Sequence, residues 1–323
     1  MKKFNLILAA VVMCAAFNVF GQTTPTPTTT VSLDNILSES QKQSENYRET
    51  FRNLLADELK TFEEFDKKGE SERTTTVRSS FLVYQSGKNQ AATAELRNVL
   101  EVNGKPIPDS QKRGEEFLAE LDKQRTLESE LQKLQKESSK FDKTWEVYGM
   151  TLNQAVALAP NLRSVFDFQL VGTESYEGGE VYVVSYRQKS KSPFITINEK
   201  ERDTAVNELS LNFNLNIPGE LKKTDILLRG KLWIDAKTFQ IRREERELVA
   251  RAADPVMLLS SNFEYQTSEF GILVPKTISM TIYNAKKEKG DRFNSLKDSI
   301  ISFEYSKFRQ TNVEVRILDD ETE

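Results

Sequence analysis

The sequence predicts an α+β protein in which a curved antiparallel sheet of roughly ten strands carries an N-terminal amphipathic helix and a long inserted helix. Two patterns lead to this prediction. Apolar residues recur every three or four positions over residues 33–66 and again over 109–142. Residues 163–318 instead alternate between apolar and polar side chains in short runs that end at turn residues. The first pattern is typical of helices, and the second is typical of half-buried strands.

The chain begins with the pattern of a cleavable signal peptide over residues 1–21. Lys2 and Lys3 precede a short apolar run, and Gly21 supplies the small residue before the expected cleavage. Lipidation at Cys14 is the alternative, in which an acylated cysteine would anchor the protein. Residues 22–32 are rich in Thr and Pro and are expected to form an extended tether. The protein is therefore expected to be exported, either to the periplasm or outside the cell.

Residues 33–150 are expected to contain two amphipathic helices that flank a β-hairpin. The first helix is predicted over 33–66, and strands are predicted over 74–84 and 93–102. Asn103-Gly104 is the signal of a type I′ turn, and the prolines in 105–108 limit the next segment to an edge. The apolar stripe of the first helix consists of Tyr47, Phe51, Leu54, Leu55, Leu59, Phe62 and Phe65.

A second long helix is predicted over residues 109–142. Its portion from Leu127 to Trp145 is close to heptad spacing, so either a coiled-coil dimer or packing on the protein's own body would cover it. A short helix is expected over 151–159, before Pro160.

Residues 151–318 are expected to continue the same sheet, and an acidic tail follows over 319–323. In the segment 208–217, apolar residues alternate with Ser and Asn, which predicts a strand with one buried and one wet face. The predicted strands are 164–171, 181–188, 194–197, 208–217, 225–234, 239–248, 262–267, 277–284, 299–308 and 313–318.

Composition excludes several functions. The chain has no histidine, and its one cysteine, Cys14, leaves with the signal peptide. Ser-His-Asp and Cys-His catalysis, thiol redox chemistry and zinc sites built from His or Cys are thereby excluded. The formal charge of −4 argues against a nucleic-acid binder. We predict no catalytic residue, metal site or cofactor, although a carboxylate-based or oxygen-ligated metal enzyme stays formally open. The charged run 242–247 is interpreted as cross-strand pairing on an exposed face.

One hairpin resembles a known superfamily. The segment Arg229-Gly230-Lys231-Leu232-Trp233-Ile234-Asp235, followed by 238–244, is similar to the central hairpin of the LolA/LolB/RseB superfamily. The resemblance implies a half-barrel of antiparallel strands that binds lipoprotein acyl chains or similar apolar ligands in the periplasm. Residues 78–83 and 96–109 are also similar to a group of secreted bacterial proteins of unknown function.

The function expected from this resemblance is an envelope protein that binds a lipid or lipoprotein acyl chain in an apolar half-barrel cavity. A non-enzymatic interaction module is the alternative, in which the helix 109–142 docks an envelope protein partner through Leu127, Leu131 and Leu134. In that case the apolar face of the sheet fills a solid core. The candidate cavity residues are Phe81, Val83, Phe166, Phe168, Leu211, Phe213, Trp233 and Phe263.

Overall fold

The structure is a computed structural model that describes residues 31–51, 54–85, 93–122, 150–199, 208–252, 254–288, 290 and 292–310. The chain divides into a unit of residues 1–32 and a unit of residues 33–323, and the helices and strands given below belong to the second unit. Several predicted features lie outside the described residues. They are the signal peptide, the tether up to residue 30, the stretch with Leu127, Leu131 and Leu134, the strand 313–318 and the acidic tail.

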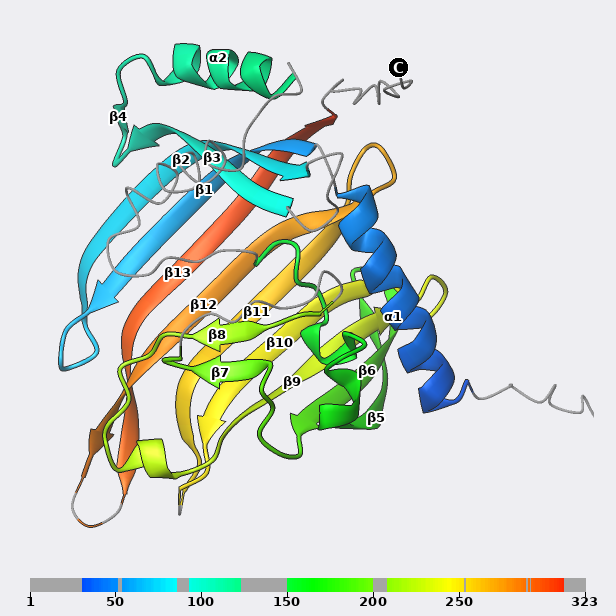
Figure 1. Ribbon diagram of the computed structural model, residues 1–323, viewed down its shortest axis with the longest axis vertical. Helices are drawn as coiled ribbons and strands as arrows, with labels where there is room; N and C mark the ends of the chain where they lie inside the picture. Colours follow the sequence, from blue (N-terminus) through cyan, green and yellow to red (C-terminus); the bar gives the residue numbers. More distant parts are fainter. Residues whose placement is uncertain are drawn as a thin grey trace, which may run out of the picture. The chain divides into compact units, whose positions relative to one another are not determined.

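Eleven strands of the described residues form one antiparallel sheet (Figure 1). Their order across the sheet is β4-β3-β2-β1-β13-β12-β11-β10-β9-β6-β5. This arrangement confirms the α+β class and the antiparallel sheet. The strands are β1 Leu54–Phe65, β2 Ser71–Gln85, β3 Thr93–Val102, β4 Lys105–Pro106, β5 Phe166–Tyr176, β6 Gly179–Gln188, β9 Ile226–Asp235, β10 Ile241–Ala250, β11 Val256–Thr267, β12 Leu273–Lys287 and β13 Phe293–Gln310.

In the middle of the sheet the first strand, β1, pairs with the last described strand, β13. The pairing extends over almost the whole length of β1. The predicted turn between β3 and β4 is confirmed, since Asn103 and Gly104 both have positive φ angles, of 50° and 75°. Pro106 ends the two-residue strand β4 at one edge of the sheet, and β5 forms the other edge.

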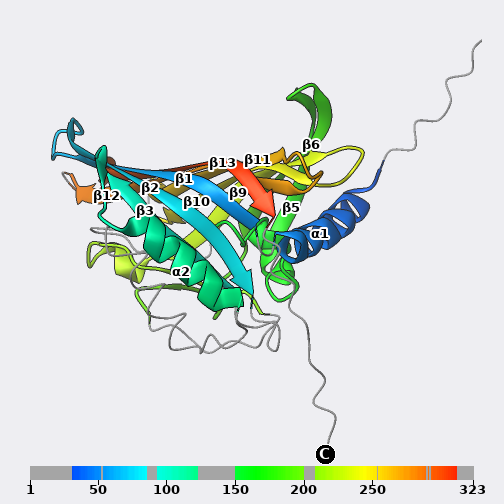
Figure 2. The same ribbon diagram turned by 90° about the horizontal axis from the view of Figure 1, so that it is seen from above.

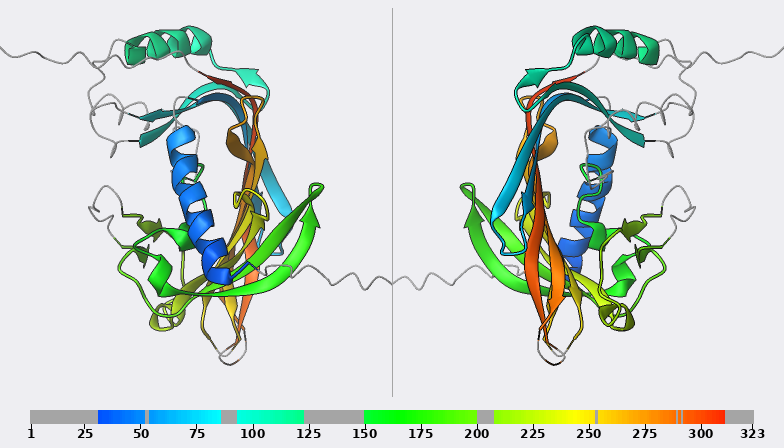
Figure 3. Two further views of the ribbon diagram at one scale, coloured as in Figure 1. Left: turned by 90° about the vertical axis from the view of Figure 1, so that its right-hand side faces the viewer. Right: turned by 90° about the vertical axis from the view of Figure 1, so that its left-hand side faces the viewer.

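Among the described residues, two helices and a small second sheet accompany the large sheet. The helices are α1 Leu33–Thr50 and α2 Ser110–Asp122, and the second sheet pairs β7 Ile195–Ile197 with β8 Leu211–Phe213 in parallel. The part of the chain that the structure describes also has three short 3₁₀ turns: η1 Val156–Leu158, η2 Arg163–Val165 and η3 Leu221–Lys223. α1 and the β7–β8 sheet lie on the same side of the large sheet (Figures 2 and 3). We call the face of the large sheet under α1 the inner face, and the opposite face the outer face.

The prediction of one helix over residues 33–66 is wrong in its second half. α1 ends at Thr50, and residues from Leu54 form β1. The buried positions at the start of β1 do alternate, but Glu58 and Lys60 occupy two of them. These charged side chains hide the period of two in the sequence. Leu55, Leu59 and Phe62 then give an accidental helical spacing.

The strand predicted over 208–217 is also wrong, because only β8 within it is a strand and it lies outside the large sheet. Two asparagine side chains take the place of a neighbouring strand. Asn161 accepts a hydrogen bond from the backbone N–H of Leu209 and donates one to its carbonyl, at 3.2 and 3.0 Å. Asn198 does the same for Leu215, at 2.8 and 2.7 Å. Similarly, the helix predicted over 151–159 is reduced to the single turn η1.

Gly230 is required where Tyr186 crosses over β9 to donate a hydrogen bond to the carbonyl of Glu245 at 3.1 Å. A Cβ atom at this position would lie 1.9 Å from that carbonyl oxygen and 2.5 Å from the Tyr186 hydroxyl. We therefore expect Gly230→Ala to lower the free energy of unfolding by about 3 kcal/mol, measured by urea denaturation. Gly219→Ala is the control, since no atom lies within 4 Å of its added Cβ. Equal urea midpoints for the two variants would contradict the expected clash.

Candidate functional site

The inner face of the sheet is apolar across most of its width. Tyr265 of β11 identifies this face, because its ring meets that of Tyr47 on α1 at a centroid distance of 5.8 Å. Residues directly opposite each other in paired strands share a face. The strand register places one row of directly opposite, buried side chains on the inner face from β2 to β6: Val77, Lys60, Phe303, Ile278, Phe263, Glu244, Leu232 and Val184. Six of these eight side chains are apolar, and Lys60 and Glu244 are charged.

Five of the eight predicted cavity residues lie on this face. Phe81, Val83 and Phe263 are buried there without exposed surface. Phe166 and Phe168 lie on the same face at the β5 edge, where both rings contact Tyr186. Two others, Leu211 and Phe213, are half-buried on β8 and thus belong to the small sheet.

The eighth residue, Trp233, lies on the outer face. Its register partners are Val183 on β6 and Arg243 on β10, and neither points to the inner face. Trp233 packs with Val181, Val183 and Tyr176 in a small outer cluster. The Arg243 guanidinium lies 4.6 Å from the centre of the indole, and the indole N–H donates a hydrogen bond to Glu174. The Trp-x-Asp hairpin therefore directs its tryptophan away from α1.

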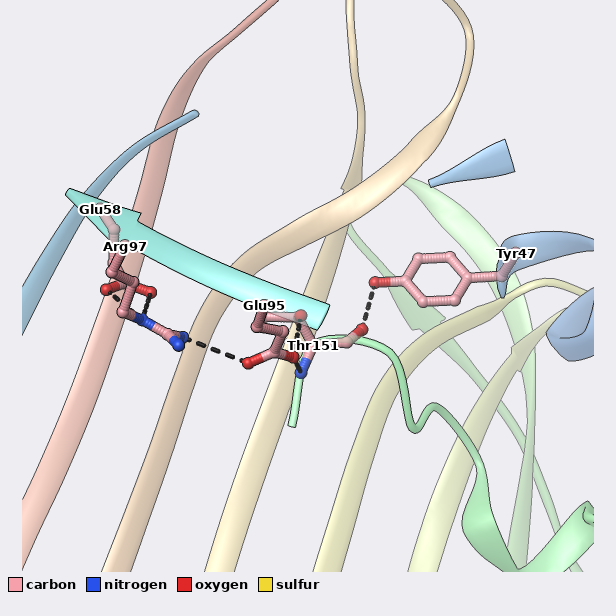
Figure 4. A network of polar contacts seen from close by, with 5 residues as sticks. All are labelled: Tyr47, Glu58, Glu95, Arg97 and Thr151. Carbon is pink, nitrogen blue, oxygen red and sulfur yellow. Dashed lines mark hydrogen bonds and ion pairs between the residues drawn. The ribbon is translucent and has the colours of Figure 1, made fainter. Parts of the chain in front are cut away.

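A buried ionic network, which we call the Arg97 cluster, interrupts the apolar inner face (Figure 4). The Nε atom of Arg97 donates to both carboxylate oxygens of Glu58, at 2.8 and 3.0 Å, and its Nη2 atom lies 3.3 Å from Glu95. Glu95 accepts hydrogen bonds from the backbone N–H and the hydroxyl of Thr151. The Thr151 carbonyl in turn accepts one from the Tyr47 hydroxyl at 2.7 Å.

Burial and charge act in opposite directions on Arg97. Burial alone lowers the pKa of its guanidinium, but Glu58 and Glu95 more than offset this effect, so the pKa lies well above its ordinary value. The three charged side chains are each less than 5% exposed, with exposed fractions of 4%, 0% and 1% for Arg97, Glu58 and Glu95. A charged group this deep in a protein needs partners, and each of the three has them here.

A second network, the Arg246 cluster, lies further along the inner face. Two nitrogen atoms of Arg246 donate to Glu244 at 2.7 and 2.8 Å, and the guanidinium lies 4.0 Å from the ring centre of Phe263. Arg246 also donates to the carbonyl of Asn153, and Glu244 accepts from the N–H of Ala155 at 2.7 Å. Ala155 has a φ of 46°, an unusual angle for a residue other than glycine, and its bonded N–H helps to hold it there.

Together the two clusters fasten residues 151–155 between α1 and the sheet. This arrangement corrects the interpretation of residues 242–247 as a wholly exposed charged run, because Glu244 and Arg246 are buried on the inner face. Sequence reasoning missed all five charged residues of the clusters. The available signal was their spacing: Glu95 and Arg97, like Glu244 and Arg246, are two positions apart on one face of a strand.

A hollow of roughly 800 Å³, the outer hollow, is the second candidate site. Its charged lining residues alternate along the strands with inner-face residues such as Tyr186, so they point to the outer face. The polar side chains that line it are Asp167, Gln169, Ser185, Arg187, Arg229, Lys231, Glu245 and Glu247.

Within the described ranges, no group of three Asp, Glu, His or Cys side chains is arranged to hold a metal ion. None of the helices in this part of the chain has the length and apolarity needed to cross a membrane.

No protein-family model matches the sequence, and no curated protein is significantly similar to it. Three solved structures align with most of the chain at low TM-scores. A DUF1329 family protein from Desulfovibrio piger is 10% identical, with 85% of this chain and 92% of that chain covered and a TM-score of 0.36. A LolA superfamily protein from Nitrosomonas europaea is 11% identical, with 87% and 94% covered and a TM-score of 0.34. The lipoprotein LppX from Mycobacterium tuberculosis is 12% identical, with 88% and 100% covered and a TM-score of 0.26.

With identities this low, the function has to be inferred from the residues of this chain.

Proposed function

We propose that the protein is an exported envelope protein that binds the acyl chain of a lipid or lipoprotein on its inner face. The observation that supports this proposal is the mainly apolar inner face from β2 to β6, which the Arg97 and Arg246 clusters interrupt. In the structure Phe81, Phe263 and Phe303 are at most 1% exposed and Tyr47 of α1 packs on Tyr265, so an acyl chain has to displace part of this cover to reach the face. In this proposal the acyl chain lies along the sheet under α1, in contact with Phe81, Phe263 and Phe303.

The energetics of burial support this ligand class. Each methylene group moved from water into an apolar site contributes about 0.8 kcal/mol, so a chain of about fourteen methylenes gains roughly 11 kcal/mol. The immobilisation of the ligand and the ordering of the chain around it offset part of this gain. Enough remains for stable binding without any polar contact. A saturated chain therefore needs only what the inner face provides.

The composition of the chain favours binding over catalysis. It contains no histidine, and the one cysteine, Cys14, precedes the folded unit. The buried carboxylates Glu58, Glu95 and Glu244 are all occupied by arginine and by hydrogen-bond donors from the chain. We therefore propose a carrier or receptor for an apolar ligand. The docking role of helix 109–142 stays a prediction, because Leu127, Leu131 and Leu134 lie outside the described residues.

Photo-crosslinking with a photoreactive fatty-acid analogue tests this function. After irradiation of residues 22–323 with the analogue, digestion and mass spectrometry should locate the label on inner-face residues, foremost Phe81, Phe263 and Phe303. The outer cluster of Val181, Val183 and Trp233 is the matched control, because it is apolar but faces away from α1. Excess unlabelled palmitate should suppress the labelling of the inner face.

Native mass spectrometry of the same protein, purified without detergent from a bacterial envelope, provides a second measurement. We expect a bound lipid mass that is lost on denaturation. A ligand-free mass, together with labelling spread equally over both faces, would be incompatible with an acyl-binding inner face.

A further inference from the structure

Three cations gather in the outer hollow. Arg187 on β6 lies directly opposite Arg229 on β9, and Lys231 follows two positions later on the same face. Side chains in directly opposite positions have Cβ atoms about 5 Å apart, and like charges in such a pair destabilise a sheet. An anion between the two arginines would remove this repulsion. The arrangement therefore favours an anionic ligand.

Each of these cations has a carboxylate directly opposite it in a neighbouring strand: Asp167 opposite Arg187, Glu245 opposite Lys231 and Glu247 opposite Arg229. Two of the three carboxylates nevertheless form their ion pairs with other cations. Glu245 pairs with Arg243 at 2.6 Å, and Asp167 with Lys189 at 3.7 Å, and neither of these cations lines the hollow. Only Glu247 pairs inside it, with Arg229 at 2.7 Å. Arg187 and Lys231 form no ion pair in the part of the chain that the structure describes. Arg187 and Lys231 thus lie beside Arg229, whose ion-pair partner is the partly exposed Glu247.

We propose that the outer hollow binds a phosphate-bearing ligand, with Arg187 and Lys231 as its main contacts. The planar guanidinium of Arg187 can bond two phosphate oxygens, and the Lys231 ammonium adds a point charge. Arg229 becomes a third contact when the ligand displaces Glu247. The volume of roughly 800 Å³ is within the range of small-molecule sites, so the hollow holds more than a bare phosphate ion.

The charged side chains of this site lie on the opposite face of the sheet from the proposed acyl site. The β5–β6 hairpin curves away from its neighbours on the side of the sheet opposite α1 (Figure 3). The phosphate group can come from a small molecule in solution or from an anionic lipid headgroup. The two sources present the same chemistry to Arg187 and Lys231, and the experiment separates them.

Isothermal titration with inorganic phosphate and with glycerol phosphate tests the first source, and flotation with phosphatidylglycerol vesicles tests the second. Neutral phosphatidylcholine vesicles are the control. The double variant Arg187→Gln/Lys231→Gln should weaken binding at least about tenfold, since two charge-assisted contacts are lost. Glu247→Gln should instead strengthen binding several-fold, because it releases Arg229 from its partner. These residues are exposed or half-exposed, so the fold should tolerate both changes.

Two exposed residues outside the hollow supply matched charge controls. Both lie at turns: Glu269→Gln makes the same charge change as Glu247→Gln, and Lys237→Gln removes one of the two positive charges that the double variant removes. Binding of soluble phosphates that falls in the double variant and not in Lys237→Gln supports the site with a soluble ligand. Binding of anionic vesicles alone, with the same dependence, supports it with a lipid headgroup. The proposal is overturned if neither probe binds, or if the control variants change binding as much as the variants of the hollow.

Discussion

Raising the pH above 10 should unfold the protein in one steep transition. Burial raises the pKa of Tyr47, Tyr186, Tyr265 and Tyr305 above the ordinary value of 10.0. Nearby carboxylates raise it further, Glu244 for Tyr186 and Glu58 for Tyr305. In the unfolded chain the same phenols ionise near pH 10.

The raised pKa of these tyrosines determines how stability changes with pH. The folded state favours the neutral phenol, so the contribution of each tyrosine to stability is fully present below pH 10. It is lost as the pH rises from the unfolded toward the folded pKa, at about 1.4 kcal/mol per pH unit. Four such groups lose about 5 kcal/mol per unit together. Because a domain is stable by only about 5–15 kcal/mol, a few pH units suffice to unfold it.

The measurement is a pH titration followed by tyrosinate absorbance and by circular dichroism. We expect the two signals to change together, because the buried phenols ionise only when the chain unfolds. Tyr265→Phe should reduce the slope of unfolding free energy against pH by about 1.4 kcal/mol per unit, since one titrating group is gone. Complete tyrosinate formation with unchanged circular dichroism would show that these phenols are accessible in the folded protein.

Arg97→Met should lower the free energy of unfolding by about 3–5 kcal/mol, because it leaves Glu58 and Glu95 charged and buried without a cation. Urea denaturation measures the loss. Arg78→Met is the matched control on β2, since the ion pair of Arg78 with Glu101 spans 3.7 Å and both side chains are partly exposed. A surface pair of this kind contributes about 0–1 kcal/mol.

A triple variant separates the ionic role of the Arg97 cluster from the volume of its side chains. Glu58→Gln and Glu95→Gln, added to Arg97→Met, remove the stranded charges, and we expect them to recover much of the lost stability. Hydrogen exchange should also become faster at Thr151 in Arg97→Met, because Glu95 accepts the hydrogen bond of its N–H. If Arg97→Met costs no more than Arg78→Met, the cluster does not stabilise the fold.

The antiparallel sheet could be predicted from the sequence, because apolar and polar side chains alternate along most strands and turn residues follow them. The Asn103-Gly104 turn illustrates this, since both positive φ angles follow from the residue types. β1 could not be predicted in the same way. Its inward positions include Glu58 and Lys60, and a pattern based on apolar residues treats both as solvent-facing. The partners that make their burial possible come from distant parts of the sequence.

The candidate site was predictable in part, for a related reason. Alternation assigns Phe81, Val83 and Phe263 to a buried face, but it cannot state which buried face lies under a helix. Trp233 is as buried as many inner-face residues, yet a small cluster on the outer face covers it. The strand register decides on which face a buried residue lies. That register depends on pairings between distant segments, such as β9 with β6, and the sequence of one segment does not determine it.

The pairing of β1 with β13 has a consequence for the order of folding. Asp57 and Arg309, which bond across this pair, are 252 positions apart in the sequence. Synthesis from the N-terminus delivers β1 to β4 long before β13, so β1 has an unpaired edge during that time. Such edges invite association with other chains, and contacts between distant residues form slowly. The first and last strands therefore meet in the slowest step that the topology allows, and the growing chain needs protection until then.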